Sequence, residues 1–538
     1  MIRGCSIGPP RGMNRLMKRK HTELPALPGL LTAVLIFAVP VLAGGPVDPN
    51  DPPPGRFVDD WAEVHLLGAK VGYMHTAMTR EGDVVRSMTD TVMRIGRVDQ
   101  RIEVSIVQSM EETISGAPRT FASEMNVAAV KTATRGVVRE GRVNVTTSQF
   151  GMEQKQDFEF PQGALMTWGM LRESIIRGYK PGTEYVLDVY APDLRLDGPV
   201  KALTLVGNDE TFDHRGEPRQ GRRVTLTMRS PVGMMTLESW VNENGDVLKA
   251  VMPAPGLGDM VLYTVDQKTA LNDFVPPEIF MKSAIKADRK LEPRSLRRVV
   301  YRVRPLDKAA DLNGLPETDA QRVVPGEDGT VEVTVTRLDY SDGRSLEAAT
   351  GHASAEPSEF LDSNLMINLD DAELMALAKR AAGEVKEPFA LADRLRRFVS
   401  EYVQAKNLNI GFATASEVAR TREGDCSEHG VLLAALGRLN KIPSRVAVGL
   451  VYVPTFGGET DIFGYHLWTQ FHLGGRWLDY DAALNESECS PTRIAFSTSS
   501  LRNTGLADLS LPLLSKIGVI DIDILHVELR EPAGEGRE

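Results

Sequence analysis

Apolar and polar side chains alternate over short stretches between residues 57 and 275, and many of these stretches are rich in β-branched residues. The segment 224–228, Val-Thr-Leu-Thr-Met, has this period of two, which is typical of half-buried strands. Asn244-Gly245 separates two further stretches and is a strong signal for a tight hairpin. One helical pattern, Ala164 to Arg177, interrupts the strands. The pattern predicts a large antiparallel β domain over residues 57–275.

A mixed, polar stretch follows at residues 276–360, where Val331–Val335 has the pattern of a strand, and we expect a small intermediate module there. Further along, the apolar positions take up a helical period. Asp370 and Glu373 fit a capping box for a helix that ends at Gly383.

A second helix is expected to begin at Pro388. Its bulky apolar and aromatic residues share one face, namely Leu391, Leu395, Phe398, Val399 and Tyr402. Arg394, Arg396 and Arg397 are interpreted as a solvated face of this helix.

After these helices come a third apolar helix and several strands, without the alternation of helix and strand that predicts a parallel sheet. An α+β domain is therefore expected over residues 361–500. A C-terminal extension at 501–538 contains a further expected strand, Val519 to Leu529.

The first 43 residues have the features of an export signal. A basic flank, Arg15 to Lys20, precedes an apolar run whose centre is Leu30 to Val39, and Val41-Leu42-Ala43 places small residues at the expected cleavage positions. The alternative is an uncleaved membrane anchor, although the central run is short for a bilayer span. We expect a signal peptide at 1–43, a Pro- and Gly-rich linker at 44–56, and export to the periplasm or cell envelope.

Composition and charge exclude several classes of function. The formal net charge of −11 argues against a nucleic-acid partner, which needs clustered Lys and Arg. Three cysteines in 538 residues do not form a disulfide framework, and neither a CxxC nor an HExxH pattern occurs. We therefore expect no metal and no cofactor.

Cys426 is the candidate nucleophile. It follows Asp425, which can cap the apolar helix 431–436, and Glu428 can complete a capping box. Free N–H groups and the helix dipole favour a thiolate at that position, whereas Asp425 and Glu428 oppose it, so a nearby imidazolium is needed. By itself, a cysteine at this position is more commonly a small buried apolar residue.

Three histidines compete for the role of base, and strand register separates them. A two-residue turn at Gly474-Gly475 pairs Leu473 with Arg476, Trp468 with Asp481 and His466 with Ala483. His466 then shares a face with Asp481, which lies diagonal to it and can orient its ring.

His472 lies roughly 20 Å from His466 at the rise of a strand, so Asp481 can orient only one of the two. His429 lies one helical turn after Cys426 but has no carboxylate nearby except its neighbour Glu428. A thiol nucleophile needs a base, and the base needs an orienting group. Cys426, His466 and Asp481 are therefore the candidate catalytic residues. The histidines of the β domain, such as His65, His75 and His214, are interpreted as surface or packed residues.

The segments Gly424-Asp425-Cys426, His466-Leu467-Trp468 and Arg476-Trp477 with Asp481 resemble the transglutaminase-like superfamily, which has a papain-like core. The resemblance covers about residues 360–500 and matches the family's Cys, His and Asp to Cys426, His466 and Asp481. Its departures are Asp481-Ala482-Ala483 in place of Asp-Pro-Thr, and Gln470 where an acidic residue is common. More loosely, the whole chain resembles exported bacterial proteins that join an N-terminal β region to this core.

The resemblance implies thiol-dependent acyl transfer or hydrolysis on protein or peptide amides through a thioester. Water as acceptor gives a protease, amidase or deamidase, and a lysine amine gives a transglutaminase. The alternative from another class is an inert module of the same fold that binds peptide or cell-envelope polymer. A third possibility is a disulfide between Cys426 and Cys489.

Overall fold

The structure is a computed structural model. It describes residues 47–97, 100–127, 130–149, 152–230, 233–254, 258–278, 284–306, 312, 314–340, 357–405, 413–502, 516 and 518–531. The expected signal peptide and the first residues of the expected linker lie outside the described residues. Within the described part of the chain, no helix is both long and apolar enough to span a bilayer.

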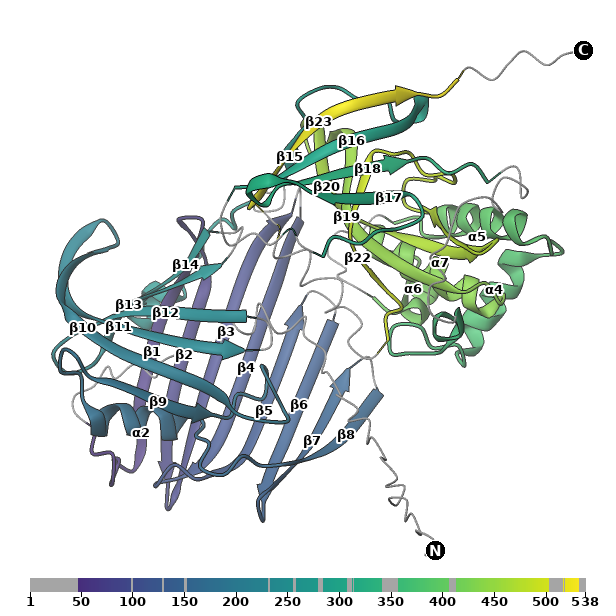
Figure 1. The fold of residues 1–538 in the computed structure, drawn as a ribbon. Coiled ribbons are helices and arrows are strands. Elements are labelled where there is room, and N and C mark those ends of the chain that lie inside the picture. The colour runs from purple at the N-terminus through teal and green to yellow at the C-terminus, as the bar shows by residue number, and fades with distance from the viewer. Residues whose placement is uncertain are drawn as a thin grey trace, which may run out of the picture.

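The N-terminal region forms one antiparallel sheet of 14 strands. Figure 1 shows this sheet in purple to teal, apart from the green helices of the C-terminal region. The strands of its first half are β1 (Gly55–Leu66), β2 (Ala69–Glu81), β3 (Val84–Arg97), β4 (Gln100–Thr113), β5 (Pro118–Val127), β6 (Val130–Arg139), β7 (Arg142–Gln149) and β8 (Met152–Glu159). The strands of its second half are β9 (Glu184–Val189), β10 (Val200–His214), β11 (Glu217–Ser230), β12 (Gly233–Val241), β13 (Val247–Ala254) and β14 (Gly258–Val265). Strands that follow each other in sequence pair throughout each half, and β1 pairs with β14 to join the halves. The predicted large antiparallel β region is confirmed.

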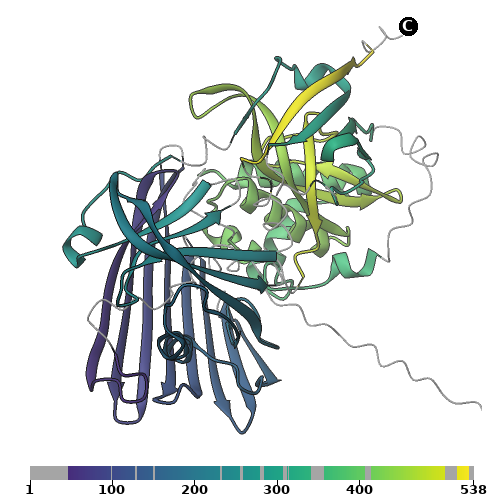
Figure 2. The same ribbon diagram turned by 60° about the vertical axis from the view of Figure 1, so that its left-hand side comes forward.

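This sheet curls so that its second half lies across its first half (Figure 2). Apolar side chains from both halves share one core, including Val64 and Ile106 from the first half and Leu187 and Leu226 from the second. The predicted helix is present as α2 (Thr167–Arg177), and its Trp168 is completely buried. A short helix, α3 (Gln267–Ala270), follows β14.

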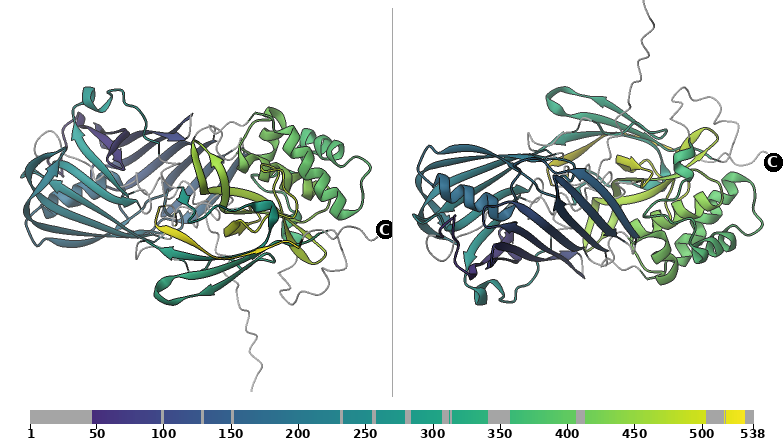
Figure 3. Two further views of the ribbon diagram at one scale, coloured as in Figure 1. Left: turned by 90° about the horizontal axis from the view of Figure 1, so that it is seen from above. Right: turned by 90° about the horizontal axis from the view of Figure 1, so that it is seen from below.

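The C-terminal region combines helices with a second antiparallel sheet, which confirms the predicted α+β class. Its helices are α4 (Ala372–Ala382), α5 (Pro388–Tyr402), α6 (Ala415–Thr421) and α7 (Cys426–Leu439), and its strands are β15 (Ile285–Lys286), β19 (Ser444–Phe456), β20 (Glu459–Leu473), β21 (Arg476–Tyr480) and β22 (Arg493–Ser499). The sheet order is β15-β20-β19-β22, with β21 paired to β20. Figure 3 shows the helices of this region, in green, gathered at the end of the molecule away from the N-terminal sheet.

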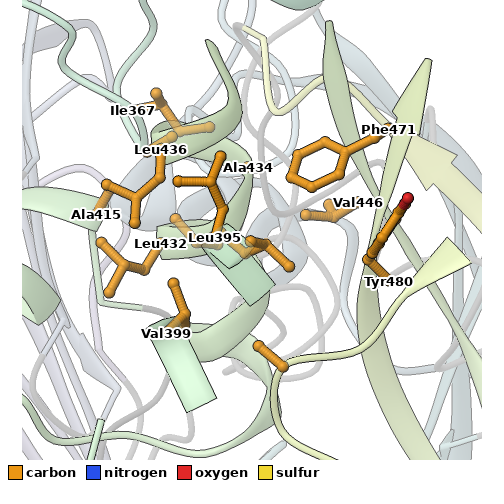
Figure 4. Packing of buried hydrophobic residues seen from close by; sticks show 14 of the residues in the cluster. Ile367, Leu395, Val399, Ala415, Leu432, Ala434, Leu436, Val446, Phe471 and Tyr480 are labelled. Carbon is orange, nitrogen blue, oxygen red and sulfur yellow. The ribbon is translucent and has the colours of Figure 1, made fainter. Parts of the chain in front are cut away.

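Helix α7 is the centre of this region, and its residues from Ser427 to Arg438 are all buried. Figure 4 shows Leu432, Ala434 and Leu436 of α7 among side chains of α5, α6 and the strands. Gly430 and Gly437 let α7 approach β20 closely, because an added Cβ would lie 2.2 Å from Leu467 and 2.4 Å from Phe471. The close contact between helix and sheet holds the first turn of α7 beside β20.

A third sheet connects segments that are distant in sequence. Its strands are β16 (Leu296–Pro305), β17 (Gln321–Pro325), β18 (Val331–Thr336) and β23 (Ile520–Leu529), in the order β17-β18-β16-β23. Short 3-10 turns lie at Pro293–Ser295, Glu327–Gly329 and Pro357–Leu361. The strand expected at Val519 to Leu529 is present as β23. It pairs with β16, which lies more than 200 residues earlier in the chain. Apolar residues of this sheet share a core with β19, β20 and β22.

Two local predictions about the helices were wrong. The N-cap of α4 is Asp371 and not Asp370, because the Asp371 carboxylate accepts the N–H groups of Glu373 and Leu374. Arg396 does not belong to a solvated face: it is buried, and it donates hydrogen bonds to Asp393 and Asn485. Asn485 lies far along the chain, so the helical pattern of α5 gives no sign of this contact.

Gly449 provides a test of how β19 and β22 pack. A Cβ at this position would lie 1.9 Å from the backbone oxygen of Ile494, which cannot move without disturbing the ladder. We expect Gly449→Ala to lower the free energy of unfolding by about 2 kcal/mol or more, measured by chemical denaturation. Gly464→Ala on β20 is the matched control, because a Cβ there meets no atom within 4 Å. Equal stability of the two variants would contradict this packing.

Candidate active site

Cys426 is the first residue of α7, at the end of the helix that faces β20. Asp425 caps the helix: its carboxylate accepts the Ser427 N–H at 2.8 Å, and its own N–H donates to Glu428 at 2.9 Å. The predicted capping box is therefore confirmed. Cys426 is partly exposed, whereas its neighbours Asp425 and Ser427 are buried. The capped helix start thus holds an accessible thiol among free N–H groups and the positive end of a helix dipole.

Gly424 is required for the turn that leads into this helix. Its φ of 151° lies in a region that residues with a side chain rarely adopt, and an added Cβ would lie 2.2 Å from the Cβ of Glu428. The turn therefore brings the backbone directly against the Glu428 side chain and fixes where Cys426 begins the helix.

Glu428, in the turn that begins with Cys426, is fully buried. Its two oxygens accept the N–H groups of Asp425 and Ala413, both at 2.9 Å, which ties the start of α7 to the segment before α6. Burial first, and then the neighbouring Asp425 charge, raise the pKa of Glu428 to about 8. The sequence indicated the capping role but gave no sign of this burial, since the contact with Ala413 is made across the fold.

His466 lies on β20, and its ring is hydrogen-bonded to Asp481. The distance from Nε2 to Asp481 Oδ2 is 2.7 Å, and both side chains are buried. The predicted pairing of Leu473 with Arg476 is confirmed and continues to Thr469 opposite Tyr480. The expected pairs beyond that point are not formed, because Asp481 leaves the ladder and pairs with Glu486. His466 nevertheless reaches Asp481 directly.

The electrostatics of this pair favour an imidazolium beside a carboxylate. Burial alone would lower the pKa of His466, but the Asp481 charge and the Cys426 thiol beside it raise the pKa to about 10. Burial would likewise raise the pKa of Asp481, yet His466 and then Arg493 hold it well below its usual value. His466 therefore interacts with both Asp481 and Cys426, and the structure brings the three candidate residues together.

The two other candidate bases are placed differently. His429 is buried, and its Nδ1 lies 2.6 Å from the backbone oxygen of Asp425, to which it donates. His472 packs against Trp477, with ring centroids 5.1 Å apart, and burial lowers its pKa. Neither contact gives the ring the buried carboxylate partner that His466 has.

Arg493, beside the site, was missed by sequence reasoning. Arg493 on β22 donates to Asp481 Oδ2 at 3.2 Å and to Glu486 Oε2 at 2.6 Å, and it lies over the Trp468 ring. An arginine twelve residues beyond Asp481 resembles any surface cation in a sequence. A weak signal was available, because the apolar neighbours of Arg493 indicate a buried strand.

Gln470 and Asp479 form a second buried polar cluster on the same face of the sheet. Asp479 Oδ1 accepts the Trp468 indole N–H at 2.8 Å and the Gln470 amide at 2.7 Å, and Gln470 in turn accepts from Arg445. Trp468, Gln470 and Asp479 therefore lie on one face of the hairpin. Gln470, the departure noted above, bridges a cation and an anion that an acidic side chain could not both satisfy.

Cys426 and Cys489 are both free thiols. Cys489 is buried, and its Sγ lies 3.3 Å from the backbone oxygen of Asp479. Burial raises the pKa of this thiol well above its usual value. The structure therefore shows Cys489 as a packed, free thiol and not as the disulfide partner of Cys426.

The histidines of the β region contact residues of their own sheet. His75 stacks on Trp61 and lies 2.6 Å from Asp59, and His65 lies 3.2 Å from Glu63. Among the residues that the structure describes, no group of three or more His, Cys, Asp or Glu side chains is arranged to hold a metal ion.

Residues 375–482 match the family model of the Transglutaminase-like superfamily. This part of the chain is thus a transglutaminase-like domain, and the match extends from α4 to just past Asp481. No curated protein matches the chain.

Two solved structures are similar to the chain. One is described as a "putative cysteine protease" from Cytophaga hutchinsonii, with 14% identity, a TM-score of 0.26, and coverage of 44% of this chain and 87% of that one. The other is described as a "putative protease" from Parabacteroides distasonis, with 12% identity, a TM-score of 0.18, and coverage of 70% and 69%.

Proposed function

We propose that this protein is a thiol-dependent enzyme that transfers or hydrolyses acyl groups of protein or peptide amides, with Cys426 as nucleophile, His466 as base and Asp481 as orienting residue. The observation that carries the proposal is an accessible thiol at a helix start beside a buried imidazole that is hydrogen-bonded to a buried carboxylate. The match of residues 375–482 to the transglutaminase-like superfamily supports it.

The ring geometry of His466 assigns the roles of its two nitrogens. Nε2 faces Asp481, so Nδ1 is the nitrogen available to exchange a proton with Cys426. The imidazolium and the N–H groups of the α7 start stabilise the thiolate form of Cys426, which is the nucleophilic form of the thiol.

The thiolate sulfur attacks the carbonyl carbon of the substrate, and the carbonyl oxygen takes the negative charge. The backbone N–H of Cys426 is one donor for that oxyanion. When the tetrahedral intermediate collapses, the bond to the leaving amine breaks, the His466 proton goes to that amine, and a thioester remains on Cys426. Water or a second amine then gives its proton to His466 and attacks the thioester carbon. The carbon–sulfur bond breaks, the acyl group leaves as a carboxylic acid or a new amide, and the Cys426 thiolate is restored beside the His466 imidazolium.

The substrate is proposed to be a protein or peptide in the periplasm or cell envelope. This placement rests on the basic and apolar N-terminal segment, which has the features of a cleaved export signal. The chemistry proposed for Cys426, His466 and Asp481 requires neither a metal nor a cofactor, because the three side chains provide the nucleophile, the proton transfer and the orientation.

The test is the pH dependence of iodoacetamide alkylation at Cys426, measured in a Cys489→Ser background with and without His466→Ala. We expect Cys426 of the parent to react faster at neutral pH than a free cysteine, and to react more slowly at the same pH when His466 is removed, because the imidazolium then no longer stabilises the thiolate. The thermal denaturation midpoint of each variant controls for folding. A folded parent that reacts with the pH profile of a free cysteine would favour the inert binding module over the enzyme.

A further inference from the structure

Arg493 contacts the carboxylate of the Asp481–His466 pair. It is the first residue of β22, and only 2% of its surface is exposed. One guanidinium nitrogen, Nη1, is 3.2 Å from Asp481 Oδ2, and the other, Nη2, is 2.6 Å from Glu486 Oε2. Its guanidinium lies 5.4 Å from the centre of the Trp468 ring. Burying a guanidinium is costly unless it is paired in this way.

We propose that Arg493 is a positioning residue of this site, which holds the Asp481 carboxylate in the orientation and ionisation state that His466 requires. This inference rests on the proposed function and adds a fourth residue to it. Arg493 acts through Asp481, and no contact between Arg493 and the thiol is part of the proposal.

The hydrogen bonds of Asp481 support this role. Its Oδ2 is shared between His466 Nε2 and Arg493 Nη1, and its Oδ1 accepts the Leu484 N–H at 2.9 Å. Three donors on three different segments therefore fix the carboxylate, so it cannot rotate away from the ring. Arg493 also joins Asp481 to Glu486, whose backbones already pair through two hydrogen bonds of 2.8 Å.

The charges around Arg493 support its proposed effect on the ionisation state of Asp481. The titratable groups that interact with it are Asp481, Asp479, Glu486, Cys489, Tyr301 and Tyr340, while His466 is faced by Asp481 and Cys426. Several of these groups are buried acids close to one another. The guanidinium offsets their mutual repulsion and keeps Asp481 negative while His466 carries its proton.

The sign of the expected effect follows from removing one positive charge. Each neighbouring acid then binds its proton more tightly, and the Asp481–His466 pair keeps its proton to a higher pH. The pH profile for Cys426 alkylation has two limbs, one where the thiol loses its proton and one where His466 loses its proton. In Arg493→Met we therefore expect both limbs to move up by about one pH unit. In Arg493→Lys the charge remains but the forked contact is lost, so both limbs stay in place while the rate at the plateau falls several-fold.

The experiment measures iodoacetamide alkylation from pH 4 to 11 in the Cys489→Ser protein, for the parent, Arg493→Met and Arg493→Lys. Arg445→Met is the matched control, because Arg445 is a second poorly exposed arginine of the same sheet that contacts Gln470 and Trp477 and not Asp481. Its limbs are expected to stay at the parent positions. Should Arg493→Met not fold, Arg493→Gln removes the same charge while keeping a donor for Asp481.

Unmoved limbs in a folded neutral variant would overturn the inference, and so would an equal shift in Arg445→Met. A shift that is present in Arg493→Met and absent in Arg493→Lys would establish the inference. A purely structural role of Arg493 would change stability and not the position of the limbs. A parent whose alkylation follows the pH profile of a free cysteine would remove the proposed function, whereas a reactive parent thiol with unmoved limbs in the Arg493 variants would remove only this inference.

Discussion

Cys426→Ser is expected to lower acyl transfer or hydrolysis by about a thousandfold or more, because a serine hydroxyl beside His466 is a far weaker nucleophile than the thiolate it replaces. Cys426 contributes little to the core, since it is partly exposed at the helix start, so stability should change little. The measurement is the rate of hydrolysis or aminolysis for an activated ester and for a peptide library, with the circular dichroism spectrum as the check on folding.

Cys489→Ser is the control for that experiment. Cys489 is buried against the backbone oxygen of Asp479, and its replacement removes a thiol without touching the proposed nucleophile. We expect this variant to keep the parent activity. Equal activity of Cys426→Ser and the parent would exclude Cys426 as the nucleophile, and loss of activity only in Cys489→Ser would point to the other thiol.

Asp481→Ala is expected to have the largest effect on stability, lowering the free energy of unfolding by about 3–5 kcal/mol near pH 6. It leaves two buried cations, His466 and Arg493, without the carboxylate that they share. The measurement is urea denaturation at a series of pH values, for the parent and the variant.

The pH dependence of this difference follows from the two folded-state pKa values. The pKa of His466 is raised to about 10, so its contribution is complete below the unfolded value of about 6.5 and is lost as pH rises toward 10. The pKa of Asp481 is depressed, so its contribution is present above the unfolded value of about 3.9 and is lost as pH falls through the folded value. The difference between parent and variant should therefore be largest between about pH 4 and pH 6.5.

Asp479→Asn is the matched control for this pH profile. Asp479 is a buried carboxylate of the same hairpin, but its partners are the Trp468 and Gln470 side chains, which do not titrate. Its replacement should give a difference in stability that is flat between pH 6.5 and pH 10. A flat profile for Asp481→Ala as well would mean that His466 does not gain its proton affinity from Asp481.

Local patterns were sufficient for a large part of the site. The capping box at Asp425 and Glu428 depends on residues three positions apart, and the structure confirms it. The register of the hairpin depends on the two-residue turn Gly474-Gly475, and Leu473 does pair with Arg476. The prediction failed where the ladder ends, because Asp481 pairs with Glu486 and not with Trp468. A turn sets the register near itself but does not determine how far the pairing continues.

The sequence by itself determined the strand-rich N-terminal region, the α+β character of the C-terminal region and the thiol, imidazole and carboxylate candidates, because each depends on short-range periodicity or on the residue type. Only the tertiary structure decided that β1 pairs with β14, that β23 joins β16, and that Arg493 lies against Asp481. Alternation reports that a strand is half-buried and does not report which strand lies beside it. In the same way, a charged residue in a sequence shows its charge, but its burial depends on partners that only the folded chain brings together.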